Sequence, residues 1–462
     1  MTTMKTSLVL PAFFALALTG CTAIGPDYNA PDIQFESKFV GGASQDTLEA
    51  SELAWWRYLN DPVLNDLVSI GLDQNLDVRS ALERIVEARE NARRFGAAEQ
   101  LNGDISLTSR RSRNDAGDYN TESNATADAF YVFDLFGEFS SAQERSLAEL
   151  EAAEFDVGTV KLAYLADVVS SYILVRYFQT AAQITRQSIT TRRQTLNIVN
   201  QRAAASDSTQ LEVAQAQSLL ANAQASLPLL EAQARVNAFR IATLLGTPTT
   251  TVLNKLGVST TIPTPSGGLA IGVPADLLRN RPDIRASERR LAAATSDIGV
   301  AAARLYPALR LNGTVSSGDT DSWSFGPSLD IPVFDRSRRD ATRNIAISDA
   351  KQAELGYRNE VFLAVEEVQA AMALTDARQR QFLAFTQAVA TAERVQTLSR
   401  ESYEGGVVTL DEVLDAERTR LANRLDQALS LSEWAQAWVQ MQVSLGKGWQ
   451  ATSATTLAAA IK

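Results

Sequence analysis

Two long segments without proline, residues 140–202 and 336–402, limit most strongly what this chain of 462 residues can fold into. Both are rich in Ala, Glu, Gln, Arg and Leu, and their apolar residues recur at helical spacing. A helix of this length, rising about 1.5 Å per residue, would be roughly 90 Å long. Such helices cannot fold around a small globular core, so we expect them to pack side by side along their length.

The two segments belong to an internal repeat. Glu212-Val213 matches Glu412-Val413, and Leu245-Gly246 matches Leu445-Gly446, both at an offset of 200 residues. We expect each repeat to contain a helix, two strands, a long helix, a turn and a second long helix, with a break or kink at Pro228. The predicted division is a signal peptide, an N-terminal segment, the first repeat, a linker, the second repeat and a C-terminal tail, at 1–20, 21–60, 61–246, 247–278, 279–446 and 447–462.

Each repeat holds a pair of segments in which apolar and polar residues alternate, predicted as strands at about 103–113, 124–135, 307–318 and 321–332. In the last one, Trp323, Phe325 and Leu329 alternate with polar residues. This pattern is typical of transmembrane barrel strands, although a half-buried sheet in a soluble protein gives it too. Four strands cannot close a barrel, and unpaired backbone groups in hydrocarbon cost several kcal/mol each. Membrane strands of this chain would therefore require several copies to share one barrel.

The N-terminus predicts export and lipid attachment. Lys5 and the apolar stretch over 8–18 are typical of a signal peptide. Leu18-Thr19-Gly20-Cys21 then resembles a bacterial lipobox, and Cys21 is the only cysteine, so no disulfide competes for it. We expect Cys21 to carry diacylglycerol and an N-acyl chain; an ordinary secretory peptide with an incidental cysteine is the alternative. Thr22 stands where an aspartate would mark inner-membrane retention, which favours the outer membrane.

Composition excludes several classes of function. The chain has no histidine, which excludes His-based acid–base, nucleophilic and metal chemistry. Its formal net charge is −11 and it has no basic run, so nucleic acid is a poor partner. No constellation of residues supports an enzyme, and we predict no catalytic residue, no cofactor and no metal site.

Several motifs together resemble one family. They are the lipobox, Trp55-Trp56, Asp61-Pro62, Asn75-Leu76-Asp77, Asp276-Leu277-Leu278, Arg281-Pro282-Asp283-Ile284, Pro332-Val333-Phe334-Asp335, Val413-Leu414-Asp415-Ala416 and Leu445-Gly446-Lys447-Gly448-Trp449. On these motifs, from Cys21 to about Trp449, the chain resembles the TolC-like outer membrane factors, specifically the NodT-type lipoproteins that serve RND multidrug efflux pumps.

The resemblance implies a mixed α and β membrane protein in the bacterial outer membrane. Three copies would form a twelve-stranded transmembrane β-barrel, continued by an α-helical barrel in the periplasm and surrounded by a belt built from 30–60, 247–278 and the C-terminal tail. The implied partners are outer membrane lipid, a periplasmic adaptor (membrane fusion) protein and an inner-membrane RND transporter. The chain would be a passive exit duct for drugs or other small toxic compounds. A TolC-like exit for type I protein secretion and a non-channel helical scaffold are the alternatives.

The helix-to-helix turns at 202–209 and 402–409 are the expected periplasmic tip. Thr209-x-x-Glu212 and Thr409-x-x-Glu412 match the capping box, which predicts two equivalent turns. The family usually has a glycine near position 206, where this chain has a serine. The resemblance assigns adaptor docking to this tip, against the alternative of plain exposed turns; the residues concerned are Ala204, Ala205, Ser206, Asp207, Ser208, Gly405, Gly406, Val407 and Val408.

A group of charges follows the second turn. Asp411, Asp415 and Arg418 fall at i, i+4 and i+7 and share one helical face, whereas the matching residues of the first repeat are uncharged. In a trimer, three copies of this face would meet near the axis, where ion pairs could close the channel mouth. The resemblance links the positions of Asp415 and Arg418 to a closed periplasmic gate, and Asp411 joins them by spacing alone. An ordinary charged helix surface is the alternative.

Overall fold

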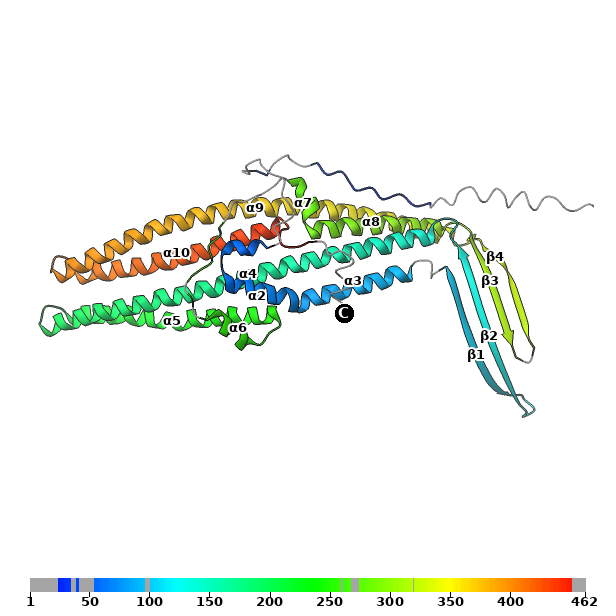
Figure 1. The fold of residues 1–462 in the computed structure, drawn as a ribbon, viewed down its shortest axis with the longest axis horizontal. Coiled ribbons are helices and arrows are strands. Elements are labelled where there is room, and N and C mark those ends of the chain that lie inside the picture. Colours follow the sequence, from blue (N-terminus) through cyan, green and yellow to red (C-terminus); the bar gives the residue numbers. More distant parts are fainter. Residues whose placement is uncertain are drawn as a thin grey trace, which may run out of the picture. The chain divides into compact units, whose positions relative to one another are not determined.

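The computed structural model of the chain describes residues 24–34, 39–40, 54–95, 100–257, 259, 261–266, 274–318 and 320–450, and Cys21 lies outside them. The described chain is mostly helical and holds one β-sheet (Figure 1). It divides into two compact units. The first, here called the sheet unit, comprises Met1–Gln34, Leu82–Asp156 and Asp283–Glu360; the second, the hairpin unit, comprises Phe35–Ala81, Val157–Pro282 and Val361–Lys462. Each unit thus combines segments of both sequence repeats.

The sheet unit contains four antiparallel strands in the order β1-β2-β3-β4, and each repeat supplies one hairpin. The strands are β1 (Leu101–Arg113), β2 (Tyr119–Phe133), β3 (Ala308–Ser317) and β4 (Ser322–Asp330). Strand β2 begins earlier than the sequence predicted, because the first hairpin stays paired as far as Arg113 opposite Tyr119. A tight turn closes this hairpin, with Gly117 at a φ of +95°, which favours glycine.

Each hairpin of the sheet leads into a long helix, β2 into α4 (Glu138–Ala204) and β4 into α9 (Arg336–Glu404). The first parts of both belong to the sheet unit, together with most of α3 (Leu76–Arg94) and α8 (Pro282–Ala303). Asp134 caps α4, because its carboxylate accepts the backbone N–H groups of Phe139 at 3.2 Å and Ser140 at 2.9 Å. Ion pairs join the start of α4 to α8. One of them links Arg145 on α4 to Asp297 on α8 at 3.2 Å.

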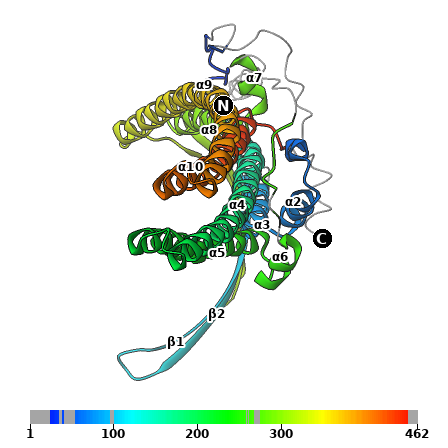
Figure 2. The ribbon, with the colours of Figure 1, turned by 90° about the vertical axis from the view of Figure 1, so that its left-hand side faces the viewer.

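The hairpin unit is built on two helix pairs. The end of α4 turns into α5 (Gln210–Leu245), and the end of α9 turns into α10 (Leu410–Ser444); Figure 2 looks onto these ends. Helix α5 continues through Pro228, so the helix is not broken there, although the proline removes one N–H from the hydrogen-bond ladder of its 36 residues. Four short helices complete the described part of the unit: η2 (Trp55–Leu59), α2 (Pro62–Gln74), α6 (Thr249–Leu256) and α7 (Pro274–Asn280).

The core of the hairpin unit fixes the segments near both chain ends to the helices. Trp55 is fully buried, lies edge-to-face against Trp438 at 5.8 Å, and donates its indole N–H to the carbonyl of Lys447 at 3.0 Å. Asp61 caps α2 by accepting the N–H of Val63 at 2.9 Å and also accepts the hydroxyl of Tyr172. The Trp55-Trp56 motif of the sequence therefore packs in the core of this unit, and the Asp61-Pro62 motif caps the start of α2.

Among the helices of the described residues, α4 alone has a window long and apolar enough to cross a membrane. More than half of that window, 56%, is buried inside the chain, which is typical of a core helix.

Candidate functional site

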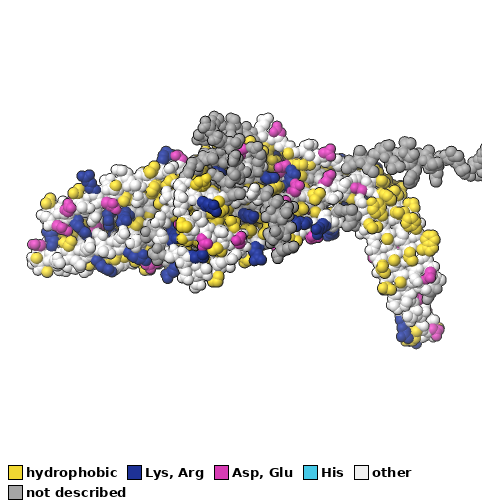
Figure 3. Space-filling model, viewed as in Figure 1, with side chains coloured by type: hydrophobic (Ala, Val, Ile, Leu, Met, Phe, Trp, Pro, Cys, Tyr) yellow, Lys and Arg dark blue, Asp and Glu magenta, His cyan; other side chains and the backbone are white. Residues whose placement is uncertain are grey.

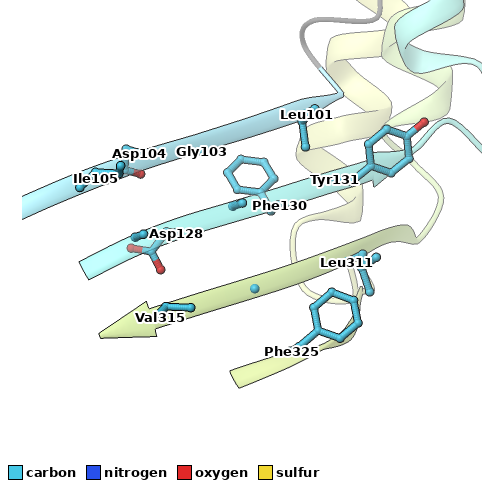
Figure 4. A pocket seen from close by; sticks show the side chains of 13 residues that line it. Leu101, Gly103, Asp104, Ile105, Asp128, Phe130, Tyr131, Leu311, Val315 and Phe325 are labelled. Atoms are coloured by element: carbon cyan, nitrogen blue, oxygen red, sulfur yellow. The ribbon is translucent and has the colours of Figure 1, made fainter. Parts of the chain in front are cut away.

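The sheet has one apolar and one polar face, and the strand register extends each face across all four strands. Trp323 lies opposite Val315, and Val315 opposite Ala127. Side chains from every strand line a shallow hollow of the sheet (Figure 4). The apolar face carries Leu101, Ile105, Leu107, Ala125, Ala127, Ala129, Tyr131, Phe133, Leu309, Leu311, Val315, Trp323, Phe325 and Leu329. The opposite face is mainly polar, with Phe130, Val132 and Ala308 toward the helix end of the strands; its polar residues include Asp104, Ser106, Thr108, Thr126, Asp128, Arg310, Asn312, Thr314, Ser316, Ser322, Ser324, Ser328 and Asp330.

Much of the apolar face is uncovered within the chain. Trp323 is 80% exposed and Phe325 70% exposed, and Ile105 and Leu107 are exposed as well. Hydrophobic side chains gather along the strands in Figure 3, with charged side chains at the far end of the first hairpin. Contiguous apolar surface of this kind marks a membrane or protein contact rather than a face in water.

The sheet has two open edges. Strand β1 pairs only with β2, and β4 only with β3, among the described residues. Each edge strand therefore presents a row of backbone N–H and C=O groups without a partner in the sheet. In hydrocarbon these groups would each need a hydrogen bond from another strand.

The two turns at the ends of the helix pairs have the same geometry. The N–H of Asp207 donates to the carbonyl of Arg202 at 2.8 Å, and the N–H of Val407 donates to that of Ser402 at the same distance. One residue earlier, Ser206 and Gly406 both adopt the left-handed conformation, with φ of +65° and +73°. Both turns are thus closed by a Schellman-type hydrogen bond, offset by 200 residues.

The predicted capping box forms at the first turn. The hydroxyl of Thr209 accepts the N–H of Glu212 at 3.2 Å, and the carboxylate of Glu212 accepts the N–H of Thr209 at 2.7 Å. Ser208 donates a further hydrogen bond to the same carboxylate at 2.6 Å. This bond, followed by the Thr209 N–H, lowers the pKa of Glu212 below its usual value, so the carboxylate stays ionised to a lower pH than a free glutamate.

The prediction of a second capping box is wrong. Thr409 occupies the N-cap position with suitable backbone angles, yet its side chain makes no capping hydrogen bond. Position 408 holds a valine where position 208 holds the serine that supports Glu212, and Val408 packs against the apolar cluster of Val199, Leu410 and Val413. The second turn is therefore fixed by hydrophobic contacts in place of the box.

We expect opposite effects from exchanging the residues of the two turns. Ser206→Gly should stabilise the protein by about 0.5–1 kcal/mol, because glycine adopts positive φ without steric strain. Gly406→Ser should destabilise it by a similar amount: a Cβ there meets no atom within 4 Å, so only backbone strain acts. Thermal unfolding of both variants measures the difference; equal shifts in the same direction would contradict this account.

The residues predicted as a gate lie on the exposed side of α10. The guanidinium of Arg418 contacts the carboxylate of Asp415 at 3.4 Å, and these side chains are 65% and 71% exposed. Asp411 is exposed one turn earlier and forms no ion pair among the described residues. An exposed pair of this kind contributes only about 0–1 kcal/mol. The structure thus brings two of the three predicted residues together.

A buried carboxylate beside this pair escaped the sequence analysis. The side chain of Glu417 is 2% exposed, accepts the hydroxyl of Thr195 on α4 at 2.6 Å and lies 3.6 Å from the guanidinium of Arg400 on α9. Arg400 also donates to the Thr195 hydroxyl at 3.0 Å. Burial lowers the pKa of nearby Arg192, and the charge of Glu417 partly offsets that effect. Glu417 therefore joins both helix pairs. The one signal in the sequence that could have pointed to it is the uncharged Gln217 at the matching position of the first repeat.

The comparison with known proteins decides the family. The family model described as outer membrane efflux protein matches residues 67–247 and 273–447. The chain belongs to this family. It is 35% identical to nodulation protein T of Rhizobium leguminosarum bv. viciae, over 97% of this chain and 96% of that protein. It is 32% identical to the pyoverdine export outer membrane protein OpmQ of Pseudomonas putida, over 87% and 89% of the two chains.

The solved structures agree with this assignment. The outer-membrane channel OprN aligns with a TM-score of 0.81 at 30% identity, over 93% of this chain and all of OprN. The resemblance inferred from the motifs is confirmed: this is an efflux protein of the outer membrane with the mixed α and β fold of its channels.

Proposed function

We propose that this outer membrane efflux protein is the passive exit duct of a tripartite RND-type pump, and that three copies form the duct. The observation that carries the proposal is the four-stranded sheet with an exposed apolar face, a polar face and two open edges. The duct would use no cofactor and catalyse no reaction. Its cargo would be drugs or other small toxic compounds, which fits relatives named for the export of pyoverdine and toluene.

Closure of the sheet explains why one chain is not enough. The backbone groups along the edges of β1 and β4 need partners in lipid, and the edges of sister copies supply them. Three copies give twelve strands, a barrel wide enough for a channel. The apolar face then turns to lipid and the polar face to water in the lumen, as in other membrane barrels.

The helix pairs would form the periplasmic tunnel, and their turns its tip. Residues Ala204–Ser208 and Gly405–Val408 present two turns of equal geometry, which suits the docking of an adaptor protein that contacts each copy twice. Asp411, Asp415 and Arg418 would line the mouth of the tunnel, and the buried Glu417 behind them would hold the two helix pairs together in the closed state. Opening would follow when the adaptor engages the tip and the helix pairs separate.

The lipid on Cys21 would anchor each copy next to its strands. The N–H of Ile24 donates to the carbonyl of Phe136, which follows β2, at 3.3 Å. Ile24 is the first described residue after Cys21, so the described chain begins beside the end of β2, where the lipid would enter the membrane. Acyl chains buried there contribute about 0.8 kcal/mol per CH₂, which makes the attachment effectively permanent.

We expect Cys21→Ser to abolish labelling of the protein with radioactive palmitate. Insertion of the barrel should persist, because strand closure and the apolar face act without the lipid. Labelling and the amount of protein in the outer membrane fraction measure the two effects. Continued labelling of Cys21→Ser would place the lipid elsewhere, and complete loss from the membrane would make the lipid essential for insertion.

Reconstitution tests the proposed function. The purified protein should form a particle of three copies and conduct ions across a planar lipid bilayer. In cells that lack this gene, sensitivity to hydrophobic toxic compounds should increase, and the gene should restore resistance only when its adaptor and transporter are present. A monomer that never conducts would overturn the proposal. Restoration of protein secretion without any change in resistance would favour the type I exit instead.

A further inference from the structure

The far end of the β1–β2 hairpin carries two arginines on the same face as the apolar residues. Arg111 pairs with Thr121 and Arg113 with Tyr119; on this face they lie one and two rows beyond the row of Ser109 and Ser123 that ends the apolar region. Because side chains alternate along a strand, both arginines share the face of Leu107, whereas Arg110 lies on the polar face.

Both guanidinium groups lie over the same aromatic ring. Their Cζ atoms lie 4.5 Å (Arg111) and 5.4 Å (Arg113) from the centre of the Tyr119 ring. Asp115 and Asp118 in the turn, and Glu122 on the polar face, are the nearest acidic residues along the hairpin. None forms an ion pair with either arginine in the described part of the chain, and Arg113 donates to the carbonyl of Gly117 in the turn at 3.0 Å. Two cations held on one ring repel each other, and an anion bound between them would remove that repulsion.

The position of the pair along the strands matches the headgroup layer of a membrane. The apolar rows on β2 run from Phe133 to Ala125, which is about 27 Å along the strand and about 20 Å along the membrane normal at the usual tilt. Arg111 lies about 10 Å further along that normal, on the side away from the start of α4. Tyrosine is also the residue type enriched where membrane and water meet.

We propose that Arg111 and Arg113 bind the phosphate groups of a lipid in the outer leaflet, with Tyr119 holding the two side chains in place. The proposal rests on the proposed barrel, because only a membrane-inserted sheet brings this face to lipid. A guanidinium matches phosphate with two parallel hydrogen bonds. The apolar side chains of Leu107 and Ala125 below the pair favour a lipid over free phosphate, since acyl chains of the same molecule would cover them.

Lipid retention by the purified protein tests this site. The probe is lipid A carrying two phosphates, added to the protein in phosphatidylcholine nanodiscs and counted by native mass spectrometry. The wild type should retain it, and Arg111→Gln with Arg113→Gln should weaken retention at least tenfold. Arg110→Gln, which removes the neighbouring charge from the opposite face, should retain it like the wild type. The variant with Arg111→Lys and Arg113→Lys should bind with intermediate strength, because it keeps both charges and loses the paired N–H donors of the guanidinium groups.

The other outcomes overturn the proposal in distinguishable ways. Equal retention by the wild type and the double glutamine variant, or equal retention of dephosphorylated lipid A, would exclude phosphate recognition by this pair. Competition by millimolar inorganic phosphate alone would show an anion site without lipid specificity. Conductance and copy number are measured on the same samples: a protein that forms no conducting trimer contradicts the proposed function, whereas conducting trimers with unselective lipid retention contradict the lipid site only.

Discussion

Replacing Phe325 by arginine should prevent the channel from inserting into the outer membrane. Phe325 lies opposite Gly313, and Gly313 opposite Ala129, in the middle row of the apolar face. An arginine at the midplane of a barrel's lipid face costs about 2–4 kcal/mol. Three copies share the barrel, so the total of about 6–12 kcal/mol matches the whole stability of a typical domain. The amount of heat-resistant trimer in the outer membrane fraction measures the effect.

Ser324→Arg is the matched control for this prediction. Ser324 precedes Phe325 on the same strand and lies opposite Thr314 on the polar face, in the same row as Asp128. An arginine there would face water and a nearby carboxylate, so the trimer should form at the wild-type level. If Ser324→Arg abolished insertion while Phe325→Arg inserted normally, the assignment of the two faces would be reversed.

The faces of the sheet were predictable because they depend on a local pattern. Alternation fixes which residues share a side of a strand, and pairing in register extends that side to its neighbours. The start of β2 was missed for a related reason. Residues Tyr119–Ser123 are polar on both faces, because the hairpin there continues past the apolar rows, and only backbone pairing holds it together.

The contacts at the tip show where a local pattern is not sufficient. Thr209-x-x-Glu212 and Thr409-x-x-Glu412 are the same motif, yet only the first forms the box, because Ser208 supports it and Val408 does not. Helical spacing likewise selected the exposed Asp415 and Arg418 and passed over Glu417 between them. Spacing shows which residues share a face; only the packing of α4 and α9 against α10 determines which face is buried.

Glu417→Ala should open the resting channel more than any change at Asp415 or Arg418. The side chain of Glu417 is buried against Thr195 and Arg400, and removing one partner of a buried ion pair costs about 3–5 kcal/mol. The guanidinium of Arg400 is one-quarter exposed, so the lower end of that range applies. We expect a several-fold rise in single-channel conductance in planar bilayers and a lower Tm, whereas Asp415→Ala, in an exposed pair worth about 0–1 kcal/mol, should change both only slightly.

Three further variants separate the contacts of Glu417. Glu417→Gln keeps an acceptor for the Thr195 hydroxyl and loses the charge that faces Arg400, while Thr195→Val removes the hydroxyl and keeps the size of the side chain. If the charge holds the helix pairs together, the conductance of Glu417→Gln should be nearly as high as that of Glu417→Ala. The conductance of Thr195→Val should lie between those of Glu417→Gln and the wild type. Gln217→Ala, at the exposed matching position on α5, should leave the conductance unchanged. The opposite result is wild-type conductance in Glu417→Ala together with raised conductance in Asp415→Ala. It would show that the exposed pair of Asp415 and Arg418, and not the buried contact of Glu417, holds the channel closed.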